Sequence, residues 1–232
     1  MEEGRARTCV TGGTGFIACW IIKRLLEDGY SVNATSTSSS GDTKGMTFLT
    51  NLPGACQKLQ LLKAHLTEPE SFKEAIKGCI GVFQVASPMD FKEKEEDEEI
   101  VTKTSINGAL GIMKACLTSN TVKRFVYTSS GSAVSYNGIK EDDDEIVMGE
   151  SFWGDVDYLR TSKPFGWSYA ISKTLAEKAV LEFGKENGLD VVTVITPFVI
   201  GPFICPKLPG SVRSPLYLLF GMFNKFCFEF NY

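Results

Sequence analysis

Thr11-Gly12-Gly13-Thr14-Gly15-Phe16-Ile17-Ala18 is the stretch of this 232-residue chain that decides its fold. Residues 7–10 before it have the composition of a short strand, and residues 16–26 after it have the apolar spacing of a helix. A glycine turn between a first strand and a first helix lets backbone N–H groups and the helix amino terminus come close to a pyrophosphate. The stretch therefore predicts a dinucleotide-binding turn, and an ordinary tight turn is the alternative.

Strands and helices continue to alternate along the rest of the chain. Further strands are predicted at residues 30–35, 58–62, 80–85, 124–128 and 190–195, and further helices at 70–76, 99–116 and 169–186. This alternation is typical of a parallel sheet covered by helices on both faces. We predict the α/β class, a Rossmann-type doubly wound parallel sheet. Residues 1–196 form the NAD(P)-binding domain with the catalytic residues, and residues 197–232 begin an incomplete substrate-binding region.

The glycine turn fits two versions of the dinucleotide fingerprint. It can be aligned as Gly13-x-Gly15-x-x-Ala18 or as Gly12-x-x-Gly15-x-x-Ala18. Ala18 stands at the last small position, which mainly permits close packing of helix on strand and tolerates alanine. We therefore expect a small shift of the helix and retained binding.

The residues after the second strand bear on the choice between NADP and NAD. NAD-specific sites usually place an acid about 20 residues after the glycines to bind the ribose 2′-hydroxyl. Here residues 34–39 read Ala-Thr-Ser-Thr-Ser-Ser, so no acid repels a 2′-phosphate. Hydroxyl groups can donate hydrogen bonds to that phosphate, and Lys44 is the nearest cation. We expect NADP(H), with NAD(H) as the alternative, and a solvated Lys44 without a ligand is an equal alternative.

A second motif, Tyr169-Ala170-Ile171-Ser172-Lys173, places a phenol and an amine on one helical face. Carbonyl reduction needs a hydride and a proton. We assign the proton to Tyr169, and we expect the ammonium of Lys173 and a positive nicotinamide ring to favour its phenolate. Ser130, after the predicted strand 124–128, would polarise the substrate oxygen. Each residue alone has a structural alternative: a core tyrosine, a surface lysine and a strand cap.

Composition excludes several classes of function. The net charge of −4 argues against a nucleic-acid partner. The seven cysteines are odd in number and lack Cys-x-x-Cys spacing, which indicates neither a disulfide framework nor a zinc site. The only histidine, His65, has no ligand pattern around it, so it is a loop residue and no metal is predicted. The acidic amino end is unlike a signal peptide, and residues 216–223 are far shorter than the roughly 20 residues of a membrane helix, so we expect a cytoplasmic protein without a membrane span.

With these motifs in place, the chain resembles the extended short-chain dehydrogenase/reductases (the NAD-dependent epimerase/dehydratase family), and within them the plant dihydroflavonol reductase group. The resemblance extends from about Arg7 to Leu208. Besides the glycine turn, it is carried by residues 48–54, 86–88, 123–125, 129–134, 163–167 and 172–179.

The resemblance implies NADPH-dependent reduction of a flavonoid- or isoflavonoid-type ketone, with Ser130, Tyr169 and Lys173 as the catalytic set. It also implies a cofactor-binding set, which includes Tyr169 and Lys173. The remaining members are Gly12, Gly13, Thr14, Gly15, Phe16, Ile17, Thr37, Lys44, His65, Leu66, Val85, Ala86, Ser87, Pro197, Phe198, Val199 and Ser211. A sugar-nucleotide epimerase or dehydratase shares this fold and catalytic set, and a truncated dinucleotide-binding remnant without turnover is a third reading.

The chain departs from the family pattern at several places. Thr37 stands where an arginine is common, and His65 where an aspartate that helps to hold the adenine is usual. The resemblance fades before the aromatic segment 226–232, so we expect a shortened chain with impaired turnover, able to self-associate through this tail. Residues 150–163 are expected to overhang the substrate, with packing as the alternative. The acidic runs 93–99 and 141–145 are expected to be solvated helix starts or loops.

Overall fold

The computed structural model describes residues 5–37, 47–88, 95–138, 148–205 and 212. The predictions for Lys44, for Ser211, for the acidic run 141–145 and for the aromatic tail lie outside these described residues.

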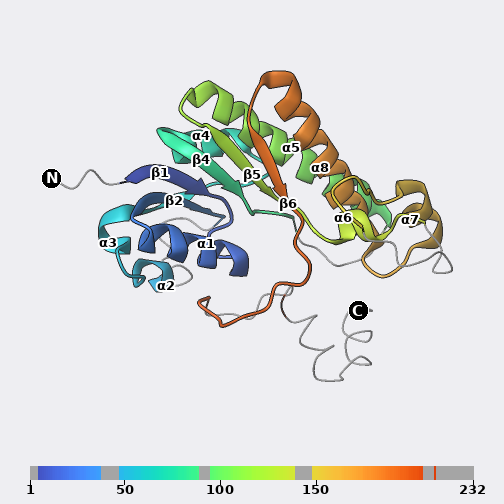
Figure 1. The fold of residues 1–232 in the computed structure, drawn as a ribbon, viewed down its shortest axis with the longest axis horizontal. Coiled ribbons are helices and arrows are strands. Elements are labelled where there is room, and N and C mark those ends of the chain that lie inside the picture. The colour runs from blue at the N-terminus through green and yellow to red at the C-terminus, as the bar shows by residue number, and fades with distance from the viewer. Residues whose placement is uncertain (1–4, 38–46, 89–94, 139–147, 206–211, 213–232) are drawn as a thin grey trace.

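Six parallel strands form one sheet, as the sequence predicts (Figure 1). Their order in the sheet is β3-β2-β1-β4-β5-β6. The strands are β1 (Arg5–Val10), β2 (Tyr30–Ser36), β3 (Leu59–Lys63), β4 (Cys79–Gln84), β5 (Arg124–Thr128) and β6 (Val191–Val194). The chain runs outward from β1 to β3 and then returns to the other side of β1, so the order reverses between β1 and β4. This is the Rossmann order, and ligands of such sheets bind where the order reverses.

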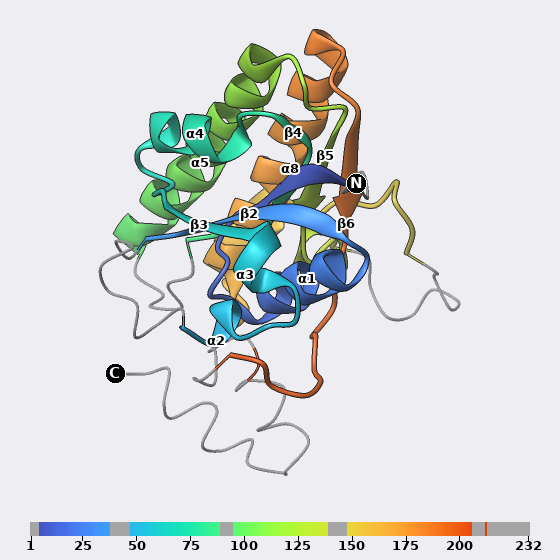
Figure 2. The same cartoon turned by 90° about the vertical axis from the view of Figure 1, so that its left-hand side faces the viewer.

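Helices cover both faces of the sheet (Figures 1 and 2). One face carries α1 (Phe16–Glu27) with the short α2 (Thr47–Thr50) and α3 (Ala55–Lys58). The other carries η2 (Pro69–Phe72), α4 (Lys73–Ile76), α5 (Glu95–Ser119) and α8 (Trp167–Asn187). Each layer buries its own apolar cluster against the strands, and the predicted fold class is confirmed.

The sequence did not predict four of the short helices. Besides α2 and α3 these are α6 (Ser132–Ser135) and α7 (Val156–Ser162), which are too short for the apolar spacing to repeat clearly. The predicted helix 99–116 is longer at both ends and starts inside the acidic run, as acids at a helix amino end favour. The expectation that this run is solvated is wrong for Glu98, which is 8% exposed, accepts a hydrogen bond from Thr102 and pairs with Arg160 at 3.5 Å.

The residues after β6 turn back across α1. The indole Nε1 of Trp20 donates to the Pro202 carbonyl at 3.0 Å, and the rings of Phe16 and Phe203 lie 5.6 Å apart. Cys205 and Val212 are buried in the same cluster as α1. In the described part of the chain, no helix is both long and apolar enough to cross a membrane.

Candidate active site

A cavity of about 870 Å³ lies at the carboxyl ends of the strands, where the sheet order reverses. Segments that follow all six strands line it together with the start of α8. The cavity brings together most of the predicted site, namely Gly12, Thr14, Gly15, Phe16, Ile17, Thr37, His65, Leu66, Val85, Ala86, Ser87, Ser130, Tyr169, Lys173, Pro197, Phe198 and Val199. Gly13 is buried beneath the turn instead of facing the cavity.

The glycine turn is held by backbone contacts. Gly13 N–H donates to the Thr35 carbonyl at 2.6 Å, and Gly12 N–H donates to the Thr35 hydroxyl at 3.3 Å. Gly12 has a φ of +67°, and a Cβ added there would lie 3.0 Å from the Cα of Ala86. Only glycine fits this backbone conformation and this close approach.

The amino end of α1 opens into the cavity. Its N-cap is Gly15, and no side chain caps the helix. In contrast, the Asp155 carboxylate caps α7 by accepting from the amides of Asp157 and Tyr158. An uncapped helix start beside a glycine turn presents positive partial charge and N–H donors, which suits the pyrophosphate of a dinucleotide. The residues present therefore fit the predicted cofactor.

Thr11 and Gln84 support this turn, and the sequence reasoning gave them no role. The hydroxyl oxygen of Thr11 accepts from the amides of Val85 and Ala86, both at 3.0 Å. Its proton is directed to Gln84 Oε1 at 3.4 Å, and Gln84 Nε2 donates to the Ala86 carbonyl at 2.9 Å. No sequence pattern signals such contacts across more than 70 residues, as the separations of 73 to 75 show.

The segments after β2 and β3 bring hydroxyl groups and one imidazole to the cavity. Thr37 is exposed at the end of β2, and His65 Nδ1 lies 2.7 Å from the Thr67 hydroxyl. Among the described residues that line the cavity, Lys173 is the only lysine or arginine, and it lies on α8. Across the described ranges no three His, Cys, Asp or Glu side chains are placed to hold a metal ion.

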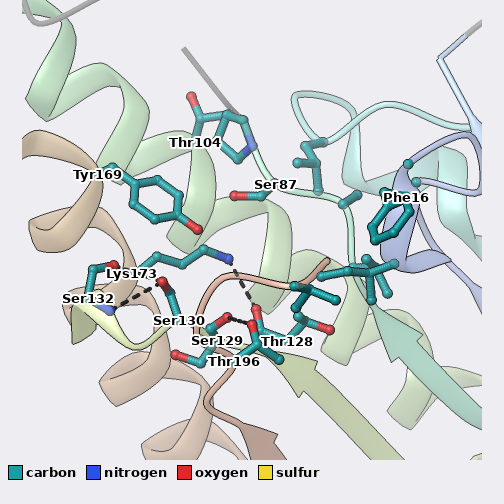
Figure 3. Close-up of a pocket in the computed structure, with 18 of the residues that line it drawn as sticks. Phe16, Ser87, Thr104, Thr128, Ser129, Ser130, Ser132, Tyr169, Lys173 and Thr196 are labelled. Carbon is teal, nitrogen blue, oxygen red and sulfur yellow. Dashed lines mark hydrogen bonds between the residues drawn. The ribbon is translucent and has the colours of Figure 1, made fainter. Parts of the chain in front are cut away.

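Tyr169 and Lys173 enter the cavity from the first turns of α8 (Figure 3). The helix starts at Trp167, directly after Gly166 with its φ of +76°. Lys173 is 6% exposed, and its Nζ donates to the Thr128 carbonyl at 3.1 Å. The same Nζ lies 5.8 Å from the centre of the Tyr169 ring. The amine is therefore fixed between the end of β5 and the phenol.

Burial dominates the acid–base chemistry of this end. Burial raises the pKa of Tyr169 above its ordinary value, and a hydrogen bond with Ser130 acts in the opposite direction. Burial lowers the pKa of Lys173 to about 8, and the charge of Glu177 raises it in part. In the protein alone, burial is the larger of the two influences on this phenol. The predicted help from the ammonium together with a bound nicotinamide ring stays a prediction. A protonated phenol is the form that donates a proton during reduction.

Ser130 lies at the end of β5, on the side of Tyr169 (Figure 3). Its oxygen accepts from the amide of Ser132 at 3.3 Å and from the Ser132 hydroxyl at 2.8 Å. These two contacts orient the Ser130 hydroxyl, so that its own proton can be directed to an oxygen in the cavity.

Two buried residues beneath this end received no role in the sequence analysis. Ser129 donates its hydroxyl proton to Glu177 Oε2, and both side chains are buried. Glu177 lies four residues after Lys173 and eight after Tyr169, so all three share one face of α8. That spacing was the available signal in the sequence.

No residue of the described segment 150–163 lines the cavity, so the structure does not support its prediction as a cover over the substrate. Lys178 Nζ lies 5.1 Å from the Trp153 ring centre, and Tyr158 is 44% exposed on α7. Neither belongs to the described residues that line the cavity, whereas Tyr136 and Phe165 do. Packing is therefore the better description of Trp153.

The sheet order and the cavity define the class of this protein: a Rossmann-type α/β protein whose serine, tyrosine and lysine face a dinucleotide-type cleft. The model of the NAD dependent epimerase/dehydratase family matches residues 8–216. The chain belongs to this family.

Its relatives include plant flavonoid reductases, so the resemblance to that group is confirmed. Vestitone reductase from Medicago sativa is 60% identical over 221 residues, which make up 95% of this chain and 66% of that protein. Dihydroflavonol 4-reductase from Callistephus chinensis is 46% identical over 220 residues, 95% of this chain and 59% of that protein. The chain thus spans somewhat less than two thirds of the length of these relatives.

Solved structures of reductases share the fold of this chain. The crystal structure of alfalfa vestitone reductase superimposes with a TM-score of 0.79 at 58% identity, over 92% of this chain and 64% of that chain. Yeast methylglyoxal/isovaleraldehyde reductase Gre2 complexed with NADPH superimposes with a TM-score of 0.72 at 28% identity, over 84% of this chain and 59% of that chain.

Proposed function

We propose that this chain is an NADPH-dependent reductase of a flavonoid- or isoflavonoid-type ketone. The observation that carries the proposal is the meeting of Ser130, Tyr169 and Lys173 in the cavity that the glycine turn also lines. The names of its relatives, vestitone reductase and dihydroflavonol 4-reductase, supply the substrate class.

The residues have separate tasks in this scheme. The glycine turn and the start of α1 would hold the pyrophosphate, the segment at Val85 would flank the cofactor, and the segment at Pro197 would line its nicotinamide side. The bound cofactor supplies the hydride. Tyr169 donates the proton to the carbonyl oxygen, Ser130 hydrogen-bonds that oxygen, and Lys173 stabilises the phenolate that remains.

A preference for NADP over NAD is part of the proposal. Ser36 and Thr37 bring hydroxyl groups to the cavity at the end of β2, and no acid stands beside them there among the described lining residues. The NADPH complex of the related Gre2 supports the same choice. NAD(H) is the alternative, and competition between the two cofactors in a binding titration decides it.

The substrate side of the cavity suits a flat aromatic molecule. Tyr136, Phe165 and Phe198 line it, and the last two remain 47% and 60% exposed. Stacking on such rings favours an aromatic ketone over a sugar nucleotide, which needs a second phosphate cradle.

Further predictions remain part of this proposal. They are the division into residues 1–196 and 197–232, a cytoplasmic location and self-association through the aromatic tail. No disulfide joins the six described cysteines, in keeping with the reducing compartment that the sequence predicts. Light scattering of the purified full chain measures self-association directly.

The experiment uses the purified full chain. NADPH fluorescence on titration measures binding, and loss of NADPH absorbance with vestitone, a dihydroflavonol or a flavanone measures turnover. We expect both. Binding with no turnover on any ketone would support the remnant without activity, and conversion of a sugar nucleotide instead would support the epimerase or dehydratase alternative.

A further inference from the structure

A carboxylate lies buried beneath the catalytic side chains, and the scheme above does not use it. Glu177 is 2% exposed and accepts the hydroxyl proton of Ser129, which is 3% exposed. Buried carboxylates are rare without a partner, because removing the charge from water is costly. Packing alone therefore does not explain a carboxylate at position 177.

Glu177 acts on Lys173 through its charge. The groups around the Lys173 amine are the Thr128 carbonyl, the Tyr127 ring at 5.4 Å, the Tyr169 ring at 5.8 Å and the carboxylate of Glu177. Within the part of the chain that the structure describes, Glu177 is the one acid whose charge acts on this amine. Burial favours the neutral amine of Lys173, whereas the charge of Glu177 favours its ammonium form.

Glu177 also acts on Ser130 through the chain. Its partner Ser129 directly precedes Ser130 (Figure 3). The Ser129 amide donates to the Val194 carbonyl at 2.9 Å, and the Thr196 hydroxyl donates to the Ser129 carbonyl at 3.2 Å. The backbone of Ser129 is thus tied to β6 and the segment after it, and its side chain is tied to α8.

We propose that Glu177 is a positioning residue for the reaction: it keeps Lys173 charged and fixes the strand end that carries Ser130 against the helix that carries Tyr169. This role rests on the proposed function, because it matters to catalysis only if these three residues perform the reduction. The charge on Lys173 is a property of the protein alone, so it can be tested without turnover.

The first test is an NMR titration of full-length protein labelled at the lysine ε-carbon, with the Lys173 signal assigned by its absence in Lys173→Met. In Glu177→Gln we expect the Lys173 midpoint to move to lower pH by about one unit, because an opposite charge has been lost. Ser129→Ala keeps the carboxylate, and Glu182→Gln removes an exposed charge of the same helix, so neither should move it. An unchanged midpoint in Glu177→Gln overturns the proposal.

If Glu177→Gln does not fold, the double variant Ser129→Ala with Glu177→Met takes its place, since it leaves neither partner unpaired.

The second test is the pH profile of kcat/KM, whose alkaline limb should start at lower pH in the charge-removing variant only. Ser129→Ala should instead lower kcat about tenfold at unchanged NADPH affinity, because Ser130 is displaced. Equal kcat in Ser129→Ala and wild type refutes the positioning of Ser130. A moved NMR midpoint in a protein that reduces no ketone would refute the proposed function and leave the link from Glu177 to Lys173 standing.

Discussion

The two ends of the cavity are built in different ways. The nucleotide end consists of backbone: a glycine turn, amides held by Thr35, and the uncapped start of α1. The chemical end consists of side chains, the partly buried Tyr169 and the buried Lys173, whose pKa values burial shifts. A backbone site is sensitive to added volume, and a side-chain site is sensitive to the loss of one atom or to pH. Binding and turnover should therefore fail separately.

Removal of one oxygen from the chemical end should have the largest effect. Tyr169→Phe deletes the proton donor, so we expect kcat to fall by about 10²- to 10⁴-fold. NADPH affinity should change little, because the ring remains in place. Steady-state assay and fluorescence titration measure the two quantities. Tyr158→Phe, on an exposed tyrosine of α7, is the control and should match wild type. Retained turnover in Tyr169→Phe would remove the phenol from the mechanism.

Added volume at the nucleotide end should have the next largest effect. Gly12→Ala places a Cβ 3.0 Å from the Cα of Ala86 at a φ of +67°, and a left-handed conformation costs about 1–3 kcal/mol for a residue other than glycine. We expect the Kd for NADPH to rise about tenfold or more, as titration would show.

Gly188→Ala is the matched control for this change. Gly188 ends α8 with a φ of +64°, and no atom lies within 4 Å of an added Cβ. It should lose similar stability and keep its NADPH affinity. Equal loss of affinity in both variants would show that general destabilisation, not the glycine turn, controls binding.

Turnover and NADPH binding should also differ in their dependence on pH. The pKa of Lys173 is lowered to about 8, so its ammonium is present below that pH and is lost above it. We expect kcat/KM for reduction to fall about tenfold for each pH unit above this value. NADPH affinity, measured at each pH, should fall less because the backbone donors do not titrate. A profile that stays level through this region would mean that the charge on Lys173 is not needed.

The smallest effect is expected outside both ends. Asp155→Ala removes the cap of α7, where the carboxylate accepts from Asp157 N at 3.0 Å and from Tyr158 N at 2.9 Å. We expect a loss of about 1 kcal/mol in the free energy of unfolding, measured by denaturant titration. NADPH affinity should be unchanged. Asp157→Ala removes an acid from the same turn but no cap, so it should lower the free energy of unfolding by less. An equal loss in the two variants would show that the cap does not stabilise α7.

Local patterns predicted most of the fold. The six strands and the long helices α1, α5 and α8 occur where apolar spacing placed them, because each has enough residues to show its period. The same is true of the nucleotide end, since a glycine turn is a local feature. The helices α6 and α7 were missed, although Asp155 before Val156 is a cap signal that could have indicated α7.

The chemical end was predicted only in part. The spacing of Tyr169 and Lys173 revealed the pair, but their pKa values depend on burial, which no local pattern gives. The contact of Lys173 with Thr128 spans 45 residues, and that of Ser129 with Glu177 spans 48. Such contacts follow from the packing of α8 on the sheet, and they become visible only in the folded chain.

The hydroxyl of Thr11 has a mechanical consequence. It works as a cross-link, since one oxygen holds the amides of Val85 and Ala86 while its proton reaches Gln84. The loops after β1 and β4, which both line the cavity, must then move together. A ligand that contacts either loop therefore restrains both. Serine at position 11 would keep this cross-link, whereas valine, which has the same shape but no hydroxyl oxygen, would remove it and let the two loops move independently.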